Sequence, residues 1–225
     1  MDNIIAHYQP IVSLDTGEVL GYETLARRLK SDRTIETPGA WLGELLANED
    51  DALKLALTML GEAAAAARSL PDDVYVSLNL EIADMLIGNF QDAQQEHGLQ
   101  AIAHRLVIEV AEREALKSHA VEWSKAARDF GARIALDDFG AGVSRMTALV
   151  DLEPSYLKLD ASVTQRLGEP RIARLVRFVT AGARTLGVDV IVEGVEDAAT
   201  AKAAREAGAV AGQGWYFGRP APLPF

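Results

Sequence analysis

The sequence contains no cysteine, and this absence excludes disulfide bonds and metal sites built from thiolates. Positive charge is also scarce, because 22 lysines and arginines face 33 aspartates and glutamates, for a formal net charge of −11. Such a chain does not fit binding to a DNA or RNA polymer or to an anionic membrane surface. No apolar run approaches the roughly 20 residues of a membrane-spanning helix, and no positively charged leader with an apolar segment is present, so we expect a cytoplasmic protein without a membrane segment.

The chain of 225 residues is long enough to bury one full hydrophobic core, and 49% of its residues are hydrophobic. Barrels commonly reach this length as one unit. The sequence shows no linker, low-complexity tract or internal repeat. We therefore expect residues 1–225 to form a single domain.

Strand-like and helix-like segments alternate along the chain. Strands predicted over residues 7–14 and 19–25 are joined by four residues, and a connection this short makes an antiparallel hairpin. Further strands are predicted over residues 74–80, 105–110, 134–138, 156–160, 188–194 and 209–213, and helices over residues 38–47, 51–67, 82–96, 121–130, 171–186 and 198–207, with a short helix ending near residue 149. The spacing of roughly 20 to 35 residues per unit indicates a parallel sheet, and eight strands favour an irregular TIM (β/α)8-type barrel with one antiparallel strand.

Two adjacent carboxylates, Asp137 and Asp138, follow a short buried run and precede a glycine-containing turn. Neighbouring side chains of a strand point to opposite faces, so we expect this pair where the strand ends and its geometry relaxes. Two like charges this close raise each other's pKa unless a cation neutralises them. A divalent metal ion is the simplest such cation.

Other polar side chains fall at or near the ends of predicted strands, and the full set is Glu23, Asn79, Glu109, Asp137, Asp138, Lys158, Glu193 and Gln213. In a barrel these ends converge on one mouth. The set contains oxygen donors and one lysine but no histidine or cysteine, which suits Mg²⁺ or Mn²⁺ rather than zinc or copper. Two such ions form a clamp suited to hydrolysis of a phosphodiester, with Lys158 near the attacking water.

Eight short motifs carry a resemblance to a known family: Tyr8–Ile11, Tyr22–Arg27, Ser77–Leu80, Ile108–Glu112, Asp137–Gly140, Leu157–Asp160, Val192–Glu196 and Gly212–Gly214. In this order they resemble the motifs of the EAL-domain family of cyclic-di-GMP phosphodiesterases, which fold as irregular TIM barrels. The match spans residues 8 to 220. The resemblance implies hydrolysis of cyclic-di-GMP to linear pGpG with two Mg²⁺ or Mn²⁺ ions, in a homodimer and with regulatory domains fused or bound.

The resemblance also implies a role for each site residue. Glu23, Asn79, Glu109 and Asp137 would hold one metal ion, with Asp137 bridging to a second ion near Asp138. The catalytic group would comprise Lys158, Glu193, Gln213 and Glu112, the last of these supporting the loop after Asp138. Substrate contacts would come from Arg27, Gln9 and Leu25, and supporting contacts behind the ligands from Glu196 and Asp160.

Departures from the family pattern leave alternatives open. The signature Glu-Ala-Leu is Glu-Thr-Leu here, and the loop after the Asp pair has Val143 and Arg145 where the family usually has Tyr and Ser. One alternative is a domain that binds cyclic-di-GMP without hydrolysing it. Another is a barrel lyase that uses Lys158 as a base.

Several residues have simpler interpretations. The four histidines, His7, His97, His104 and His119, show no ligand spacing and are predicted to be surface or packing residues. Trp215 and Tyr216 are predicted to belong to the core more readily than to stack on a guanine. Helix 171–186 is predicted to bury a face of Ile172, Leu175, Val176, Val179, Ala183 and Leu186, with the arginines at 171, 174 and 177 in solvent.

Overall fold

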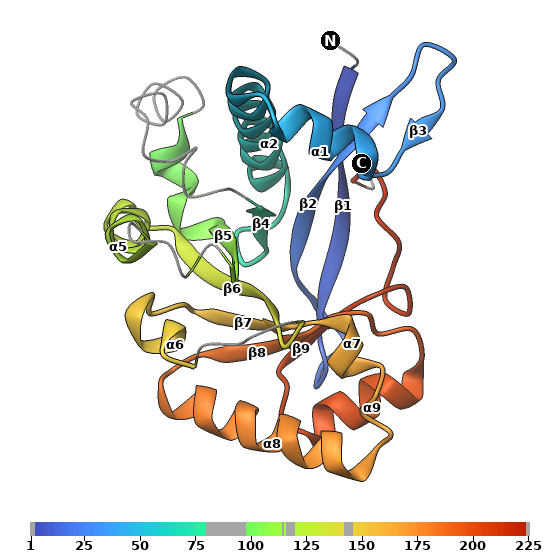
Figure 1. Ribbon diagram of the computed structural model, residues 1–225, viewed down its shortest axis with the longest axis vertical. Coiled ribbons are helices and arrows are strands. Elements are labelled where there is room, and N and C mark those ends of the chain that lie inside the picture. The colour runs from blue at the N-terminus through green and yellow to red at the C-terminus, as the bar shows by residue number, and fades with distance from the viewer. Residues whose placement is uncertain (1–2, 80–97, 114, 116–119, 142–145, 224–225) are drawn as a thin grey trace.

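A computed structural model describes residues 3–79, 98–113, 115, 120–141 and 146–223, and within these ranges the strands form one sheet. The sheet closes into a barrel because β1 (Asn3–Ser13) pairs with both β2 (Val19–Leu29) and β9 (Ala211–Gln213) (Figure 1). Between them lie β4 (Tyr75–Asn79), β5 (Leu106–Ala111), β6 (Arg133–Phe139), β7 (Tyr156–Leu159) and β8 (Asp189–Val192). The two-residue β3 (Ile35–Glu36) pairs with the end of β2, between the predicted strand 19–25 and the predicted helix 38–47.

The predicted barrel with one antiparallel strand is confirmed. β1 runs antiparallel to both of its neighbours, whereas the other neighbouring barrel strands run parallel. The hairpin of β1 and β2 is longer than predicted, since each strand has 11 residues.

Helices follow most of the parallel strands: α1 (Ala40–Leu46), α2 (Glu49–Ser69), the 3-10 helix η1 (Leu99–Arg105), α5 (Ala120–Phe130), α6 (Ala148–Asp151), α7 (Ala161–Thr164), α8 (Pro170–Thr185) and α9 (Ala198–Glu206). Side-chain caps begin three of them, because Asn48 accepts a hydrogen bond from Asp51 N at α2, Asp160 accepts one from Ser162 N at α7 and Asp197 accepts one from Thr200 N at α9. The helix predicted over residues 82–96 lies outside the described residues. Among the described helices, none is both long and apolar enough to cross a membrane.

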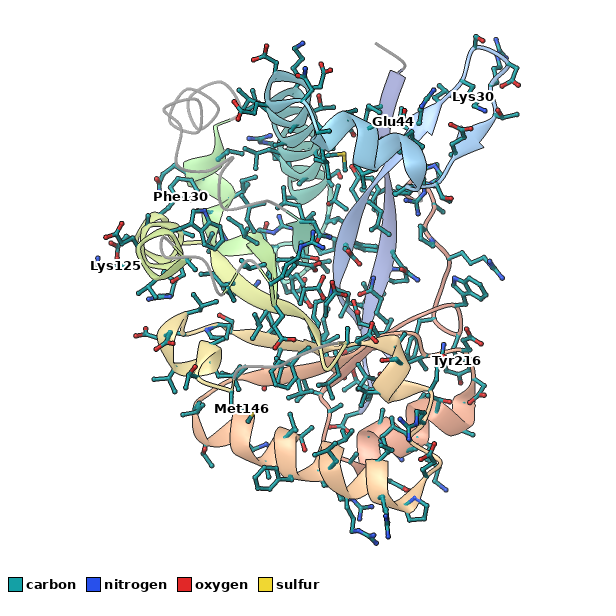
Figure 2. The ribbon with its side chains drawn as sticks, viewed as in Figure 1. Lys30, Glu44, Lys125, Phe130, Met146 and Tyr216 are labelled. Atoms are coloured by element: carbon teal, nitrogen blue, oxygen red, sulfur yellow. The ribbon has the colours of Figure 1, made fainter. Side chains whose placement is uncertain are left out.

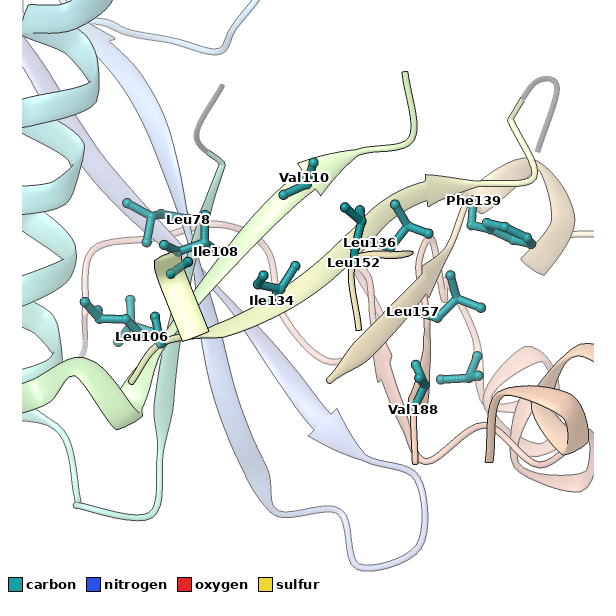
Figure 3. Close-up of a cluster of buried hydrophobic side chains, with 14 of the residues drawn as sticks. Leu78, Leu106, Ile108, Val110, Ile134, Leu136, Phe139, Leu152, Leu157 and Val188 are labelled. Carbon is teal, nitrogen blue, oxygen red and sulfur yellow. The ribbon is translucent and has the colours of Figure 1, made fainter. Parts of the chain in front are cut away.

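The outward faces of the strands are apolar and pack beneath the helices. Figure 3 shows part of this layer, in which Leu106 and Ile108 of β5 lie near Ile134 and Leu136 of β6. These side chains are at most 2% exposed. Burying each one stabilises the fold by about 1.5–3 kcal/mol relative to leaving it in water.

The inward faces of the strands form a smaller apolar plug at the amino-terminal side of the parallel strands, made by Ile11, Tyr75, Val107, Ala135, Ile191 and Ala211. Tyr75 stacks on Tyr156 with ring centroids 5.3 Å apart. Gly21 makes room for the plug, because a Cβ there would lie 2.5 Å from the Tyr75 ring. Inward side chains recur every second residue, so in the parallel strands the inward residues two positions after the plug lie nearer the carboxyl-terminal mouth.

Helix α8 differs in part from the predicted burial pattern. Val176, Val179 and Ala183 are buried as expected, but Leu175 and Leu186 are each 52% exposed. The predicted apolar face of α8 is therefore wider than the part of the helix that is actually buried. The arginines at 171, 174 and 177 are exposed, as predicted.

Candidate metal centre at the barrel mouth

Inward-facing side chains recur every second residue of a strand, and this places the acidic residues beyond the plug, at the mouth. Glu109 lies two residues after Val107 in β5, and Asp137 lies two residues after Ala135 in β6. The same step leads from Ile191 to Glu193. The register of β5 and β6 pairs Glu109 with Ala135 and Ala111 with Asp137, so Glu109 and Asp137 are offset by two residues along the sheet and still face the same mouth. Side chains spread over almost the whole chain therefore meet in one place, as the sequence predicted for the strand ends.

Lys158 of β7 stands at the centre of this group. Its ammonium Nζ lies 2.7 Å from Glu109 Oε2, 2.9 Å from Glu193 Oε1, 3.1 Å from Asp137 Oδ1 and 3.8 Å from Glu23 Oε2. Lys158 and Glu109 are each 1% exposed. A single ammonium thus links carboxylates from four other strands or strand ends.

The pKa values show how strongly these charges interact. Burial acts to lower the pKa of Lys158, but the carboxylates of Glu109, Glu193, Glu23 and Asp137 outweigh burial and raise this pKa well above its usual value. Burial raises the pKa of Glu109 well above its usual value, and the charge of Glu23 adds to the effect. The pKa of Glu193 rises to about 7 because burial and the charges of Asp137 and Glu23 outweigh the attraction of Lys158.

The two adjacent aspartates reach the same site through a bulge in β6. The strand ends at Phe139, one residue after the pair, so the two aspartates lie where the strand ends, as expected. Register with β7 shifts between Leu136 and Phe139, and Asp138 has φ 58°, a left-handed conformation rare for a residue other than glycine. As a result, carboxylate oxygens of Asp137, Asp138 and Glu193 lie within 4.8 Å of one another.

Amide side chains complete the mouth. Asn79 Nδ2 donates to Glu23 Oε1 at 2.9 Å. Gln213 Nε2 donates to Glu23 Oε2 and, at 3.1 Å, to Gln9 Oε1. Both amides therefore direct their nitrogen atoms toward other site residues, which leaves the amide oxygens as the remaining acceptors.

The donor set fits hard divalent cations. Glu23, Glu109, Asp137, Asp138 and Glu193 carry five formal negative charges against the one positive charge of Lys158. Glu109 Oε1 and Gln213 Oε1 are buried and accept no hydrogen bond from the residues that the structure describes. Unpartnered buried acceptors are costly, and carboxylate and amide oxygens are the ligands that Mg²⁺ and Mn²⁺ prefer. Two divalent ions would offset the residual formal charge of −4.

The remaining predicted residues lie around this centre. Arg27 of β2 is 7% exposed and donates to the Ala26 carbonyl oxygen at 2.8 Å. The backbone N–H of Glu112 donates to the Asp137 carbonyl oxygen at 3.1 Å, which ties the chain after β5 to β6. Asp160 caps α7 by accepting from Ser162 N at 2.9 Å.

Two cavities flank the centre. The first, of about 280 Å³, is lined mainly by apolar residues of β2, α1 and α2, together with Asn79, Glu109 and Arg113. The second, of about 340 Å³, is lined by Gln9, Glu23, Leu25, Ala161, Gln165, Glu193, Gly194, Glu196, Gln213, Gly214 and Trp215. Leu25 lines both cavities, which places it between them.

Sequence reasoning missed Arg113 and misplaced two aromatic residues. Trp215 is 57% exposed and Tyr216 is 48% exposed, so their predicted place in the core is wrong. Tyr216 lies at the edge of the molecule (Figure 2). The missed signal for Trp215 is its place just two residues after Gln213, a residue already predicted to face the mouth.

The mouth of this closed barrel holds four carboxylates around Lys158 and a fifth, Asp138, beside them, and this set of oxygen donors suits divalent cations. The family model described as EAL domain matches residues 1–220. The chain therefore belongs to the EAL domain family.

Known proteins agree with this placement. The chain is 29% identical to the cyclic di-GMP phosphodiesterase RocR of Pseudomonas aeruginosa, over 96% of this chain and 57% of RocR. The PaMucR phosphodiesterase, solved as a c-di-GMP complex, superposes with a TM-score of 0.85 at 27% identity, covering 98% of this chain and 92% of that one. BlrP1 of Klebsiella pneumoniae, solved with manganese and c-di-GMP, superposes with a TM-score of 0.82 at 26% identity, covering 97% and 56%. The chain spans 28% to 57% of the length of the curated relatives it matches.

Proposed function

We propose that the protein hydrolyses cyclic-di-GMP to linear pGpG with the help of two Mg²⁺ or Mn²⁺ ions. The observation that supports this proposal most strongly is the excess of buried oxygen donors around Lys158, including the unpartnered Oε1 atoms of Glu109 and Gln213. RocR is named as a cyclic di-GMP phosphodiesterase, and the PaMucR and BlrP1 structures contain c-di-GMP.

The roles in this proposal follow those expected from the resemblance, with Gln213 and Glu112 in the catalytic group and Glu196 and Asp160 supporting the ligands. Glu23, Asn79, Glu109, Asp137 and Asp138 hold the cations. When bound, the ions supply neutralisation of the phosphodiester charge and acidification of a water molecule. Charge neutralisation by the bound ions also explains how an acidic chain binds an anionic substrate.

In the proposed reaction, the oxygen of water forms a new bond to phosphorus and the bond from phosphorus to the ribose 3′-oxygen breaks. Lys158 donates a hydrogen bond that orients the water, and Glu193, 2.9 Å from Lys158 Nζ, accepts the water proton. The departing 3′-oxygen takes up a proton from solvent and Glu193 returns the water proton to solvent, so that the ring opens to pGpG. Arg27 contacts a phosphate, and Gln9 and Leu25 contact the rest of the substrate.

Turnover of cyclic-di-GMP in the presence of Mg²⁺ or Mn²⁺ tests the proposal, with the product resolved by chromatography. The expected product is pGpG, and the Asp137→Asn variant, which removes one charge while keeping the shape of the side chain, is expected to produce little. Tight binding without any product would contradict hydrolysis and would identify a receptor domain instead. Turnover unaffected by removal of divalent ions would contradict the role given to the carboxylates.

We further propose a homodimer. Support comes from large apolar side chains left in solvent on two elements, Val150 of α6 at 61% exposure and Leu175 and Phe178 of α8 at 52% and 72%. Light scattering after size exclusion is expected to give twice the chain mass of 24.2 kDa, and Phe178→Glu is expected to shift the protein toward the monomer. A monomeric wild-type protein at all concentrations would contradict the proposal.

A further inference from the structure

Trp215 occupies an unusual place for an indole. It follows β9 directly, lines the same cavity as Glu23, Glu193 and Gln213, and is 57% exposed. Exposed aromatic rings are common on protein surfaces, but this one faces a hollow that also holds the candidate metal ligands. A planar ligand can stack on such an apolar ring while its polar groups contact the neighbouring polar site.

Arg219 holds the ring from one side. Its guanidinium carbon lies 4.0 Å from the centroid of the Trp215 ring, which is a close cation–π contact. The contact limits rotation of the indole and fills one of its two faces. The residue remains more than half exposed and lines the cavity, so Arg219 leaves part of the Trp215 side chain accessible to a ligand.

The backbone around Trp215 is fixed to the segment that follows β8. Val195 N donates to the Gln213 carbonyl oxygen at 3.0 Å, and Tyr216 N donates to the Val195 carbonyl oxygen at 3.0 Å. Gly214 permits this approach, since a Cβ there would lie 2.2 Å from the Val195 carbonyl oxygen. The indole is thus carried on a preorganised turn, which reduces the entropy lost when a ligand binds.

We infer that Trp215 is the stacking platform for one guanine base of the dinucleotide, with Arg219 as the residue that positions the indole. The inference rests on the function proposed above. A purine ring inserted against the accessible part of the indole would lie between Trp215 and the polar side chains that share the cavity, Gln9, Gln165 and Glu196. Stacking favours any base, so these polar side chains, rather than the indole, would select guanine.

The test compares Trp215→Ala and Trp215→Phe with the matched control Tyr216→Ala, whose residue is the adjacent exposed aromatic but does not line the cavity. Steady-state hydrolysis of cyclic-di-GMP with Mg²⁺ is the assay. Trp215→Ala is expected to raise KM by about 5- to 150-fold with a much smaller change in kcat, the range that base–aromatic stacking gives. Trp215→Phe should recover most of the loss, and Tyr216→Ala should match the wild type.

Indole fluorescence provides a second readout. Titration with cyclic-di-GMP is expected to quench the wild-type emission, and the quench should persist in Trp41→Phe but disappear in Trp215→Phe. Equal KM values for wild type and Trp215→Ala, or a quench that survives in Trp215→Phe, would overturn the inference while leaving the phosphodiesterase proposal intact. A parallel fall in kcat in both Trp215 variants would also overturn it, because it would indicate damage to the metal centre. A wild-type protein that neither binds nor hydrolyses the dinucleotide would overturn both proposals.

Discussion

Replacement of Lys158 by methionine isolates the central charge of the mouth. Methionine keeps the length of the buried side chain but removes the ammonium that lies 2.7 Å from Glu109 and 2.9 Å from Glu193. In the metal-free protein the neighbouring carboxylates would then repel one another without a compensating cation. We therefore expect the substitution to destabilise the fold strongly.

The magnitude follows from burial. Lys158 and Glu109 are each 1% exposed, and removing one partner of a buried ion pair costs about 3–5 kcal/mol in the free energy of unfolding. The matched control is Lys125→Met, because Lys125 pairs with Asp129 on the surface and its side chain is 68% exposed. An exposed pair of this kind contributes only about 0.2–1 kcal/mol.

The free energy of unfolding lost in Lys158→Met should depend on pH. A carboxyl group whose pKa is raised in the folded state stabilises the fold fully below its unfolded pKa, and this contribution is lost as pH rises through the folded pKa. For Glu193 the folded pKa is about 7 against an ordinary 4.5, so the metal-free protein loses stability between these values. Removing Lys158 raises the pKa of these carboxyl groups further, and the difference between variant and wild type should therefore be larger near pH 8 than near pH 5.

Urea denaturation with a chelator or with Mg²⁺, at both pH values, measures these effects. Bound cations would replace the missing positive charge, so Mg²⁺ should stabilise Lys158→Met more than it stabilises the wild type. Mass action sets the scale, at about 2.7 kcal/mol when the ion is present at 100 times its Kd. If the variant lost no more stability than Lys125→Met, or if Mg²⁺ stabilised the two proteins equally, the charge argument for the metal centre would be refuted.

Three further substitutions test neighbouring parts of the argument. Asp137→Asn should abolish most turnover and most of the stabilisation by Mg²⁺, as measured by activity and thermal melting, while the metal-free fold becomes no less stable. Asp138→Gly should stabilise the metal-free fold by up to about 1 kcal/mol, because glycine adopts φ 58° without strain, yet lower turnover by removing a carboxylate. Gly214→Ala should destabilise by more than about 2 kcal/mol because its Cβ would overlap the Val195 backbone, whereas Gly168→Ala, with nothing within 4 Å, should be close to neutral in the same melts.

Much of this architecture could be predicted because it depends on local periodicity. Polar residues at the carboxyl ends of parallel barrel strands converge on one mouth, so the sequence predicted that Glu109, Asp137 and Lys158 lie together. The alternation of strands and helices likewise predicted a closed barrel, and the short hairpin predicted its antiparallel strand. These features follow from a few neighbouring residues at a time.

The sequence predictions were wrong or incomplete where contacts between residues far apart in the sequence decide the structure. Leu175 lies on the apolar stripe of α8, but the width of the surface that covers that stripe depends on the whole packed layer. Trp215 has the hydrophobicity of a core residue, and only its contact with Arg219 and its place in the cavity show a different environment. The bulge in β6 was missed because a register shift depends on the pairing with β7 and not on the letters of β6 alone.

The metal-free mouth combines several features that oppose stability. A left-handed Asp138, unpartnered oxygens on Glu109 and Gln213, and carboxyl groups with raised pKa values each cost free energy that the apolar layers must offset. Divalent cations would relieve the last two of these costs together, because the same oxygens that lack donors are the ones available as ligands. The free energy of unfolding should therefore depend on cation occupancy. Removal of divalent ions should lower this free energy even while the secondary structure remains intact. The same linkage explains why substitutions that relax the mouth are expected to strengthen the fold and weaken the activity.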